Sequence, residues 1–264
     1  MQKTRLPRTR ALQALTLLPC LLAAPAALAQ QASFFDDFDS LDLKRWYISD
    51  GWATGTYQNC TWAKGLVKAA DGMLDIGFSP QPYKARQYSC GSLQTRQAIG
   101  YGTFEARLKT PAGSGLNAAF FTFIGPTQGK PHDEIDFEVL LRDTGTVETT
   151  TFVNGISGDG EVGSGQQHKL PYASDSDFID YAVTWGPQTI QYFINGKPVR
   201  TIDEAFRIPT NPQRIFFSLW GTDTLTDWMG EFTPITAPIK MEVDWVGFTA
   251  AGETCQFPQS ILCG

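Results

Sequence analysis

The stretch Ile190-Gln-Tyr-Phe-Ile-Asn-Gly-Lys-Pro-Val-Arg200 decides the fold class. Its centre, Asn195-Gly196, is the strongest short-range signal for a β-hairpin, because a two-residue type I′ turn needs a positive φ at both positions. The flanking residues are rich in aromatic and β-branched side chains, which favour extended strands. The stretch therefore predicts two antiparallel strands joined by a tight turn.

Similar segments recur along the chain at residues 102–108, 180–185 and 240–246, each bounded by turn residues. The 25 glycines and 16 prolines are spread evenly, and helical periodicity is scarce. No linker, repeat or charge block divides the sequence. Residues 30–264 are therefore predicted to form one all-β domain, a sandwich of two antiparallel sheets. Lectins and glycosidases both use that architecture, so it does not decide function.

Residues 1–29 are predicted to be a secretory signal peptide. An apolar run at residues 11–24 precedes the small-residue cleavage site Ala27-Leu-Ala29. The basic residues before this run are Lys3, Arg5, Arg8 and Arg10. A membrane anchor is the alternative, but the run is shorter than the roughly 20 residues that span a bilayer. We therefore expect a secreted protein, extracellular or periplasmic, that does not stay in the membrane.

The mature chain is acidic. Removing the signal lowers Lys+Arg from 21 to 17 and leaves Asp+Glu at 27, which gives a net charge of −10. Nucleic-acid binding depends on neutralising phosphates, so this charge argues against such a partner. Nothing in the sequence indicates an oligomer, and we expect a monomer.

The cysteines predict disulfides in an exported protein. Cys20 leaves with the signal, and the remaining four cysteines permit three pairings. We favour Cys60–Cys90 and Cys255–Cys263, the second as a staple for a C-terminal tail that has little else to hold it. Free buried thiols are the alternative. A zinc site is not expected, because the sequence has no CxxC motif and two histidines.

The stretch His132-Asp-Glu-Ile-Asp-Phe-Glu-Val-Leu140 carries the candidate chemistry. Because side chains alternate across a strand, Glu134, Asp136 and Glu138 face one way and the apolar residues between them face a core. Three neighbouring carboxyls repel one another, so at least one pKa should rise. Glycoside hydrolysis uses such groups, since one carboxylate attacks the anomeric carbon and a protonated carboxyl donates to the leaving oxygen. An ordinary acidic strand facing solvent is the alternative.

The aromatic inventory favours the sugar-cleaving interpretation, because sugar rings present apolar faces that stack on aromatic rings. Core packing is the alternative for each ring taken singly. The candidates are Trp52, Tyr57, Trp62, Phe121, Phe123, Trp220 and Trp228.

Glu134-Ile-Asp-Phe-Glu138 resembles the active-site motif of glycoside hydrolase family 16. Further stretches resemble those of bacterial licheninases in the same order, and rhizobial glycanases that trim succinoglycan are similar over the whole mature chain. These stretches are Asn59-Cys-Thr-Trp62, Gly100-Tyr-Gly-Thr-Phe-Glu105, Ala119-Phe-Phe-Thr-Phe-Ile-Gly-Pro126, Phe217-Ser-Leu-Trp220, Asp227-Trp-Met-Gly230 and Val243-Asp-Trp-Val246.

The resemblance implies a β-jelly roll with a concave substrate cleft and a retaining double displacement. It implies that Glu134 is the nucleophile, that Glu138 is the general acid/base and that Asp136 assists. It supports the Cys60–Cys90 disulfide. No cofactor is expected for catalysis, but the resemblance implies a structural Ca²⁺ held partly by Asp244, for which a surface acid is the alternative.

The resemblance also predicts substrate contacts, some of them altered. Trp220 and Trp228 match cleft aromatics. Gln94 stands where licheninases usually have Arg, and Glu148 stands where they have Gln. The full predicted set of substrate-binding residues is Trp52, Gln94, Phe121, Glu148, Trp220 and Trp228.

The predicted function is endo-hydrolysis of a β-1,3-1,4-type glucan or a related bacterial exopolysaccharide. The uninterrupted E-x-D-x-E spacing resembles licheninases and xyloglucan-acting enzymes rather than β-1,3-glucanases and agarases. The first alternative is a transglycosylase that uses the same glycosyl-enzyme. The second is a carbohydrate-binding module without activity, which is disfavoured because both Glu134 and Glu138 are present.

Overall fold

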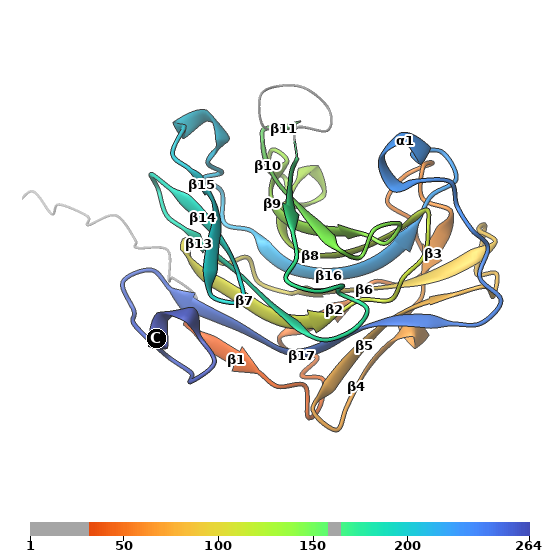
Figure 1. The fold of residues 1–264 in the computed structure, drawn as a ribbon, viewed down its shortest axis with the longest axis horizontal. Coiled ribbons are helices and arrows are strands. Elements are labelled where there is room, and N and C mark those ends of the chain that lie inside the picture. Colours follow the sequence, from red (N-terminus) through yellow and green to blue (C-terminus); the bar gives the residue numbers. More distant parts are fainter. Residues whose placement is uncertain (1–31, 158–164) are drawn as a thin grey trace, which may run out of the picture.

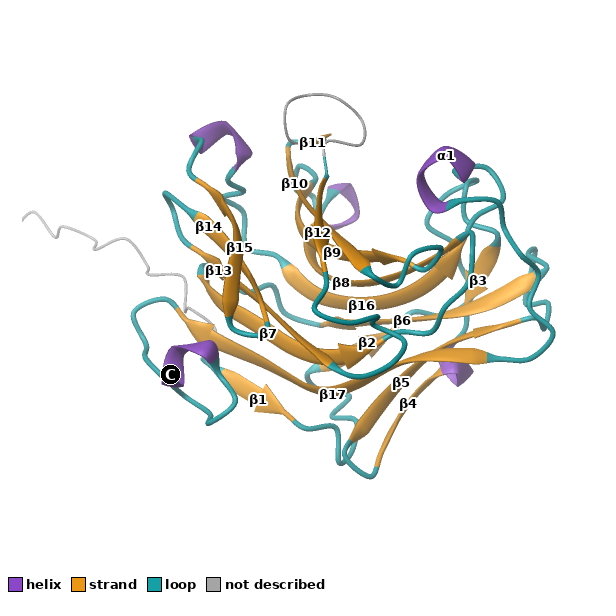
Figure 2. Ribbon diagram, in the orientation of Figure 1, coloured by secondary structure: helices purple, strands orange, loops and turns teal. Residues whose placement is uncertain are grey.

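A computed structural model describes residues 32–157 and 165–264 of the protein. The predicted signal peptide, its cleavage site and Cys20 lie outside these residues. Figure 2 shows that strands form the body of the fold and that the helices are short turns at its margins. Among the described residues, none of the helices combines the length and the apolar character that crossing a bilayer requires.

The inner sheet carries the candidate site. Its strands follow the order β2, β6, β16, β8, β9, β10 and β12, and all these pairings are antiparallel. The short strand β11 (Ile156–Ser157) pairs with the end of β10. The sheet curls, and its concave side faces the ends of the molecule where α1 (Thr226–Met229) and β11 lie (Figure 1). The strands are β2 (Trp46–Ile48), β6 (Tyr88–Thr95), β8 (Leu116–Ile124), β9 (Asp133–Leu140), β10 (Thr146–Val153), β11 (Ile156–Ser157), β12 (Gln166–Lys169) and β16 (Arg214–Gly221).

The outer sheet backs the inner one in the order β4, β5, β17, β7, β13, β14 and β15, with β1 beside β5 along the same edge of β17. Its strands are β1 (Phe34–Asp36), β4 (Val67–Ala70), β5 (Met73–Ser79), β7 (Gly102–Lys109), β13 (Ile179–Trp185), β14 (Ile190–Ile194), β15 (Lys197–Ile202) and β17 (Ile239–Ala250). The short helices are η1 (Lys64–Leu66), η2 (Pro126–Gln128), η3 (Ala205–Arg207), α1 (Thr226–Met229) and η4 (Ile261–Cys263). The predicted all-β jelly roll is thereby confirmed.

One strand joins the two sheets, a feature that the sequence did not reveal. The first residues of β6 pair with β5, whereas its later residues pair with β16. The short strand β3 (Cys60–Trp62) runs parallel to β6, the one departure from antiparallel pairing among the described strands. The Cys60–Cys90 disulfide connects these two strands and confirms the predicted pairing.

The core lies between the sheets and accounts for the alternation in β9. Ile135, Phe137 and Val139 are almost fully buried. The Phe137 ring lies 5.2 Å from the rings of both Tyr181 and Tyr192, which belong to the outer sheet. Burying a large apolar side chain stabilises the fold by about 1.5–3 kcal/mol. A one-residue slip of β9 would move these side chains into the cleft, so burial fixes the strand's register.

The predicted hairpin is β14–β15. Asn195 and Gly196 have φ values of 46° and 72°, the left-handed conformations that a type I′ turn requires. Glycine adopts this conformation without steric cost, and asparagine tolerates it better than most residues.

The C-terminal tail has more anchors than the sequence analysis expected. The Cys255–Cys263 disulfide forms as predicted. In addition, buried Glu105 on β7 accepts hydrogen bonds from Ser260 Oγ at 2.6 Å and from the Ile261 amide at 2.8 Å. The ring of Phe257 is buried, and its centroid lies 4.9 Å from that of the Phe35 ring. The expectation that little besides the disulfide holds the tail was therefore wrong.

Candidate active site

The register of three neighbouring strands arranges the candidate residues in rows across the concave face. Residues directly opposite one another in an antiparallel ladder share a face of the sheet. The first row is Phe123–Glu134–Phe152, the second is Phe121–Asp136–Thr150 and the third is Ala119–Glu138–Glu148. The sheet therefore places the predicted acids in a line along its curved floor, on the side away from the core.

Glu134 lies at one end of this line, and its side chain is 18% exposed. Its Oε2 lies 2.6 Å from Nε2 of His132. Burial raises the pKa of Glu134, whereas the hydrogen bond and the charge of His132 oppose that rise. Glu134 is thus a carboxyl with one oxygen held by an imidazole.

Asp136 occupies the centre of the line and is buried. Its burial raises its pKa well above the usual range for aspartate, and the charges of Glu134, Glu138 and Glu148 raise it further. A hydrogen bond also joins Asp136 to Glu134. These effects favour the neutral form of Asp136, which can donate a hydrogen bond to a neighbouring carboxylate.

Glu138 lies at the other end of the line. Its Oε1 accepts a hydrogen bond of 2.9 Å from Nδ2 of the fully buried Asn117. Burial is the main cause that raises the pKa of Glu138 to about 8; the Asn117 hydrogen bond opposes this, and the charges of Glu134 and Glu148 add to it. At neutral pH this carboxyl keeps a proton that it can donate.

A hollow of about 280 Å³ opens beside Glu138. It is lined by Glu138, Leu140, Arg142, Asp143, Thr146, Glu148 and Gln167. Trp228 donates from its indole Nε1 to Oε1 of Glu148 at 3.2 Å, so these two predicted substrate-binding residues are in contact. Burial raises the pKa of Glu148, and this hydrogen bond opposes the rise.

An aromatic wall stands over the acids. The rings of Trp220 and Trp228 are 6.3 Å apart, and the ring of Tyr57 lies 5.7 Å from that of Trp220. The pKa of Tyr57 is raised by burial and then by the charges of Glu134 and Glu138. Partly exposed rings next to hydrogen-bonding groups suit the apolar faces and the hydroxyls of sugars.

The remaining predicted contacts lie further across the floor. Phe121 stacks on Phe216 with 4.8 Å between ring centroids. Gln94 pairs with Phe216 in the next strand, and its Oε1 accepts from Arg214 at 3.2 Å. Trp52 lies in the segment between β2 and β3 and makes a different contact. Its ring meets that of Trp62 edge-on, with 6.2 Å between centroids. The structure thus links five of the six predicted residues to the floor or the wall.

Three residues that interact with the acids were not among the predicted site residues: Tyr57, Asn117 and His132. Tyr57 was noted only as an aromatic. His132 continues the same-face series with Glu134, because it lies two residues earlier. Asn117 belongs to the same-face series of β8 that includes Phe121, but its position opposite Glu138 depends on the pairing of strands.

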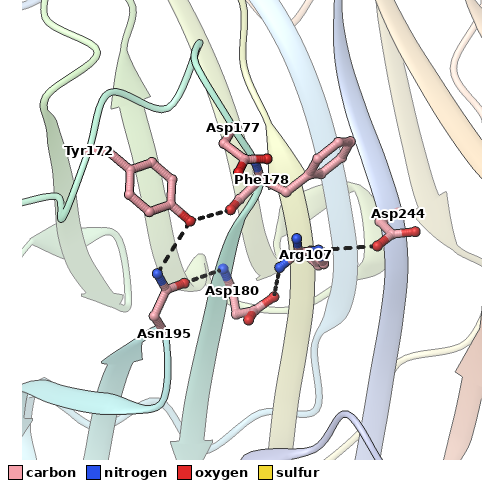
Figure 3. Close-up of polar contacts among 7 residues, drawn as sticks. All are labelled: Arg107, Tyr172, Asp177, Phe178, Asp180, Asn195 and Asp244. Carbon is pink, nitrogen blue, oxygen red and sulfur yellow. Dashed lines mark hydrogen bonds and ion pairs between the residues drawn. The ribbon is translucent and has the colours of Figure 1, made fainter.

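Asp244, the predicted calcium ligand, lies on the outer sheet and not in the cleft. Figure 3 shows its carboxylate directed at Arg107. Arg107 Nε is 3.2 Å from Asp244 Oδ2, and Arg107 Nη1 is 3.1 Å from Asp180 Oδ1. In residues 32–157 and 165–264, no three His, Cys, Asp or Glu side chains gather in a way that could hold a metal ion. The described side chains do not form a calcium cage at Asp244, and calcium there stays a prediction.

The site defines a class of enzyme. Two carboxyls with different hydrogen-bond partners lie along one strand beneath partly exposed tryptophan rings, as cleavage of a glycosidic bond requires. The protein is a glycoside hydrolase. More particularly, residues 54–247 match the model of glycosyl hydrolases family 16, and the chain belongs to that family.

Individual relatives agree with this assignment. The chain is 50% identical to endo-1,3-1,4-beta-glycanase ExoK of Rhizobium meliloti over 231 residues, which cover 88% of this chain and 84% of the relative. It is 30% identical to the beta-glucanase of Bacillus subtilis, over 86% of this chain and 90% of the relative. The structure is similar to that of the Bacillus licheniformis beta-glucanase, with a TM-score of 0.77 and 29% identity over 83% of this chain and 98% of the other.

Proposed function

We propose that the protein is a retaining endo-β-glycanase that hydrolyses β-1,3-1,4-linked glucan or a related bacterial exopolysaccharide. The observation that carries the proposal is the difference between the two ends of β9. Glu134 is held by His132 as a hydrogen-bond acceptor, whereas Glu138 has a pKa of about 8 and retains a proton. The names of two relatives, an endo-1,3-1,4-beta-glycanase and a beta-glucanase, support the linkage.

In the proposed first step, a carboxylate oxygen of Glu134 bonds to the anomeric carbon while the bond to the leaving oxygen breaks. Glu138 transfers its proton to that oxygen. In the second step, water attacks the anomeric carbon, Glu138 takes a proton from the water, and Glu134 departs as a carboxylate. Asp136 lies between them, and its raised pKa favours the neutral form, which assists by donating a hydrogen bond to the charged Glu134.

The test is the release of reducing ends from mixed-linkage β-glucan, laminarin, xyloglucan and a succinylated exopolysaccharide. Wild-type protein should cleave mixed-linkage glucan or the exopolysaccharide, and Glu134→Ala should lower the rate about a thousandfold or more. A Glu134→Ala variant as active as wild type would refute the nucleophile assignment. Redistribution of chain lengths without net release of reducing ends would favour the transglycosylase alternative.

We also propose that the enzyme is exported and acts as a monomer. The acidic mature chain and the two disulfides support export to an oxidising compartment. Mass analysis of the exported chain should find cleavage near Ala29. The proposed state is a monomer, which light scattering tests directly.

A further inference from the structure

We infer that His132 is a positioning residue for the nucleophile, holding one carboxylate oxygen of Glu134 and keeping that carboxylate ionised on the buried cleft floor. The inference rests on the proposed function, in which Glu134 attacks the anomeric carbon. His132 lies directly before β9 and on the same face as Glu134. Its Nε2 is 2.6 Å from Oε2 of Glu134.

The imidazole is clamped in this position by two aromatic rings. Phe152 stacks on the imidazole at 4.9 Å with an interplanar angle of 16°, and Phe123 meets it edge-on at 5.1 Å. These two phenylalanines are also the residues directly opposite Glu134 on β10 and β8. The same strand register therefore positions Glu134 and the imidazole that binds it, which limits the rotamers open to His132.

Other charged groups near the pair have partners of their own. Among the described residues, His132 is therefore the cation that lies against Glu134. The neighbouring carboxylate of Asp133 accepts from the Asn154 amide and from Asn211 Nδ2, both near 3 Å. The rings from β8 and β10 carry no charge. Arg214, opposite Phe123 on β16, donates instead to Gln94. Along β9, the next titratable group is Asp136, whose neutral form burial favours. Tyr57 also senses Glu134, since the charge of Glu134 adds to the rise that burial causes in the pKa of this phenol.

The proton affinities of the pair support this role. The hydrogen bond to Glu134 raises the pKa of His132, and its partial burial only partly offsets the rise. His132 in turn opposes the rise that burial causes in the pKa of Glu134. Each group therefore favours the charged form of the other, and the pair favours a protonated imidazole beside an ionised carboxylate.

The geometry assigns the two oxygens of Glu134 different tasks. Oε2 is bound by His132, so Oε1 forms the bond to the anomeric carbon, and Oε2 becomes the carbonyl oxygen of the glycosyl ester. His132 keeps its proton throughout and makes no covalent bond. When water releases the sugar, the negative charge returns to Glu134, where the imidazole again stabilises it.

The first experiment compares the pH dependence of kcat/KM in wild type, His132→Phe and His132→Gln. Phenylalanine preserves the stacked ring but removes Nε2, so the acidic limb of the kcat/KM profile should shift to higher pH by about one unit. At pH values below that limb, kcat/KM of His132→Phe should be about tenfold lower than that of wild type, with little change in KM. Glutamine restores a neutral donor and should recover part of kcat near pH 7 but leave the limb displaced.

His168→Gln is the matched control. His168 is the other histidine of the chain, and its imidazole contacts Thr149 Oγ1 at 2.9 Å, away from the cleft floor. This variant should keep the wild-type profile. A folded His132→Phe protein with the wild-type acidic limb would overturn the inference. If that variant does not fold, the position of the limb in His132→Gln decides in the same way.

A second readout separates this inference from the proposed function. In the His168→Gln background, the single remaining imidazole can be titrated by NMR without any substrate. Adding Glu134→Gln should lower the pKa of His132, because the carboxylate that raises it is gone. An unchanged titration would overturn the pairing even if the enzyme cleaves polysaccharide. Wild-type protein that cleaves none of the four polymers would refute the proposed function, and the NMR titration would still decide the pairing.

Discussion

Replacing Glu138 with glutamine should stabilise the folded protein at pH 8 while it removes the proposed general acid. Burial and neighbouring charges raise the pKa of Glu138 from 4.5 to about 8. A group with a raised folded-state pKa stabilises the fold fully below its unfolded pKa, and this contribution is lost as the pH rises through the folded pKa. One pKa unit corresponds to about 1.4 kcal/mol. Ionisation of Glu138 should therefore lower the free energy of unfolding of the wild type by about 4 kcal/mol between pH 4 and pH 8.

Glutamine keeps an oxygen that can accept from Asn117 but has no charge to bury. Because the cleft acids titrate together, the expected advantage of Glu138→Gln at pH 8 is about 2–4 kcal/mol and is nearly absent at pH 4. Urea unfolding at both pH values measures it, with Glu204→Gln as an exposed control. Equal pH dependence in wild type and Glu138→Gln would refute the claim that an ionised Glu138 is costly to bury.

Four further outcomes are expected. Glu138→Ala should slow natural polysaccharides far more than activated aryl glycosides, whose leaving groups need little protonation; equal losses would contradict the acid role. Asn117→Leu removes the donor that favours ionised Glu138, so the basic limb of the rate profile should move upward from pH 8 by about one unit. Asp136→Asn should shift the profile and lower the rate less than Glu134→Ala does. EDTA should lower the melting temperature if calcium binds at Asp244, and an unmoved melting temperature would remove that prediction.

The alternation in β9 predicted the face of each acid, because a strand whose apolar residues are buried has no freedom in register. The Asn195-Gly196 turn predicted its own hairpin for a similar reason, since few residues adopt two successive positive φ values. These features depend on neighbours in sequence. Each could therefore be read without knowing how the strands pair.

Contacts between distant strands were beyond that reasoning. Asn117 meets Glu138 because β8 lies beside β9, and Trp228 meets Glu148 across 80 residues of sequence. The anchoring of the tail by Glu105 depends on a contact across 155 residues. Local patterns contain no information about such pairings, so the tail anchors, the Asn117 partner of Glu138 and the Trp228 partner of Glu148 emerged only from the structure.

The pairing of β1 with β17 has a consequence for how the chain could be cut. Phe34 lies opposite Phe248, and Ser33 Oγ accepts from the Ala250 amide at 2.8 Å, so both ends of the sheet framework meet at one place. The exposed turn at Gly196 lies in the β14–β15 hairpin. Exposed turns of this kind tolerate new chain ends. We expect a circular permutant that begins at Lys197, with a short linker closing the old ends, to retain the strand pairings described above.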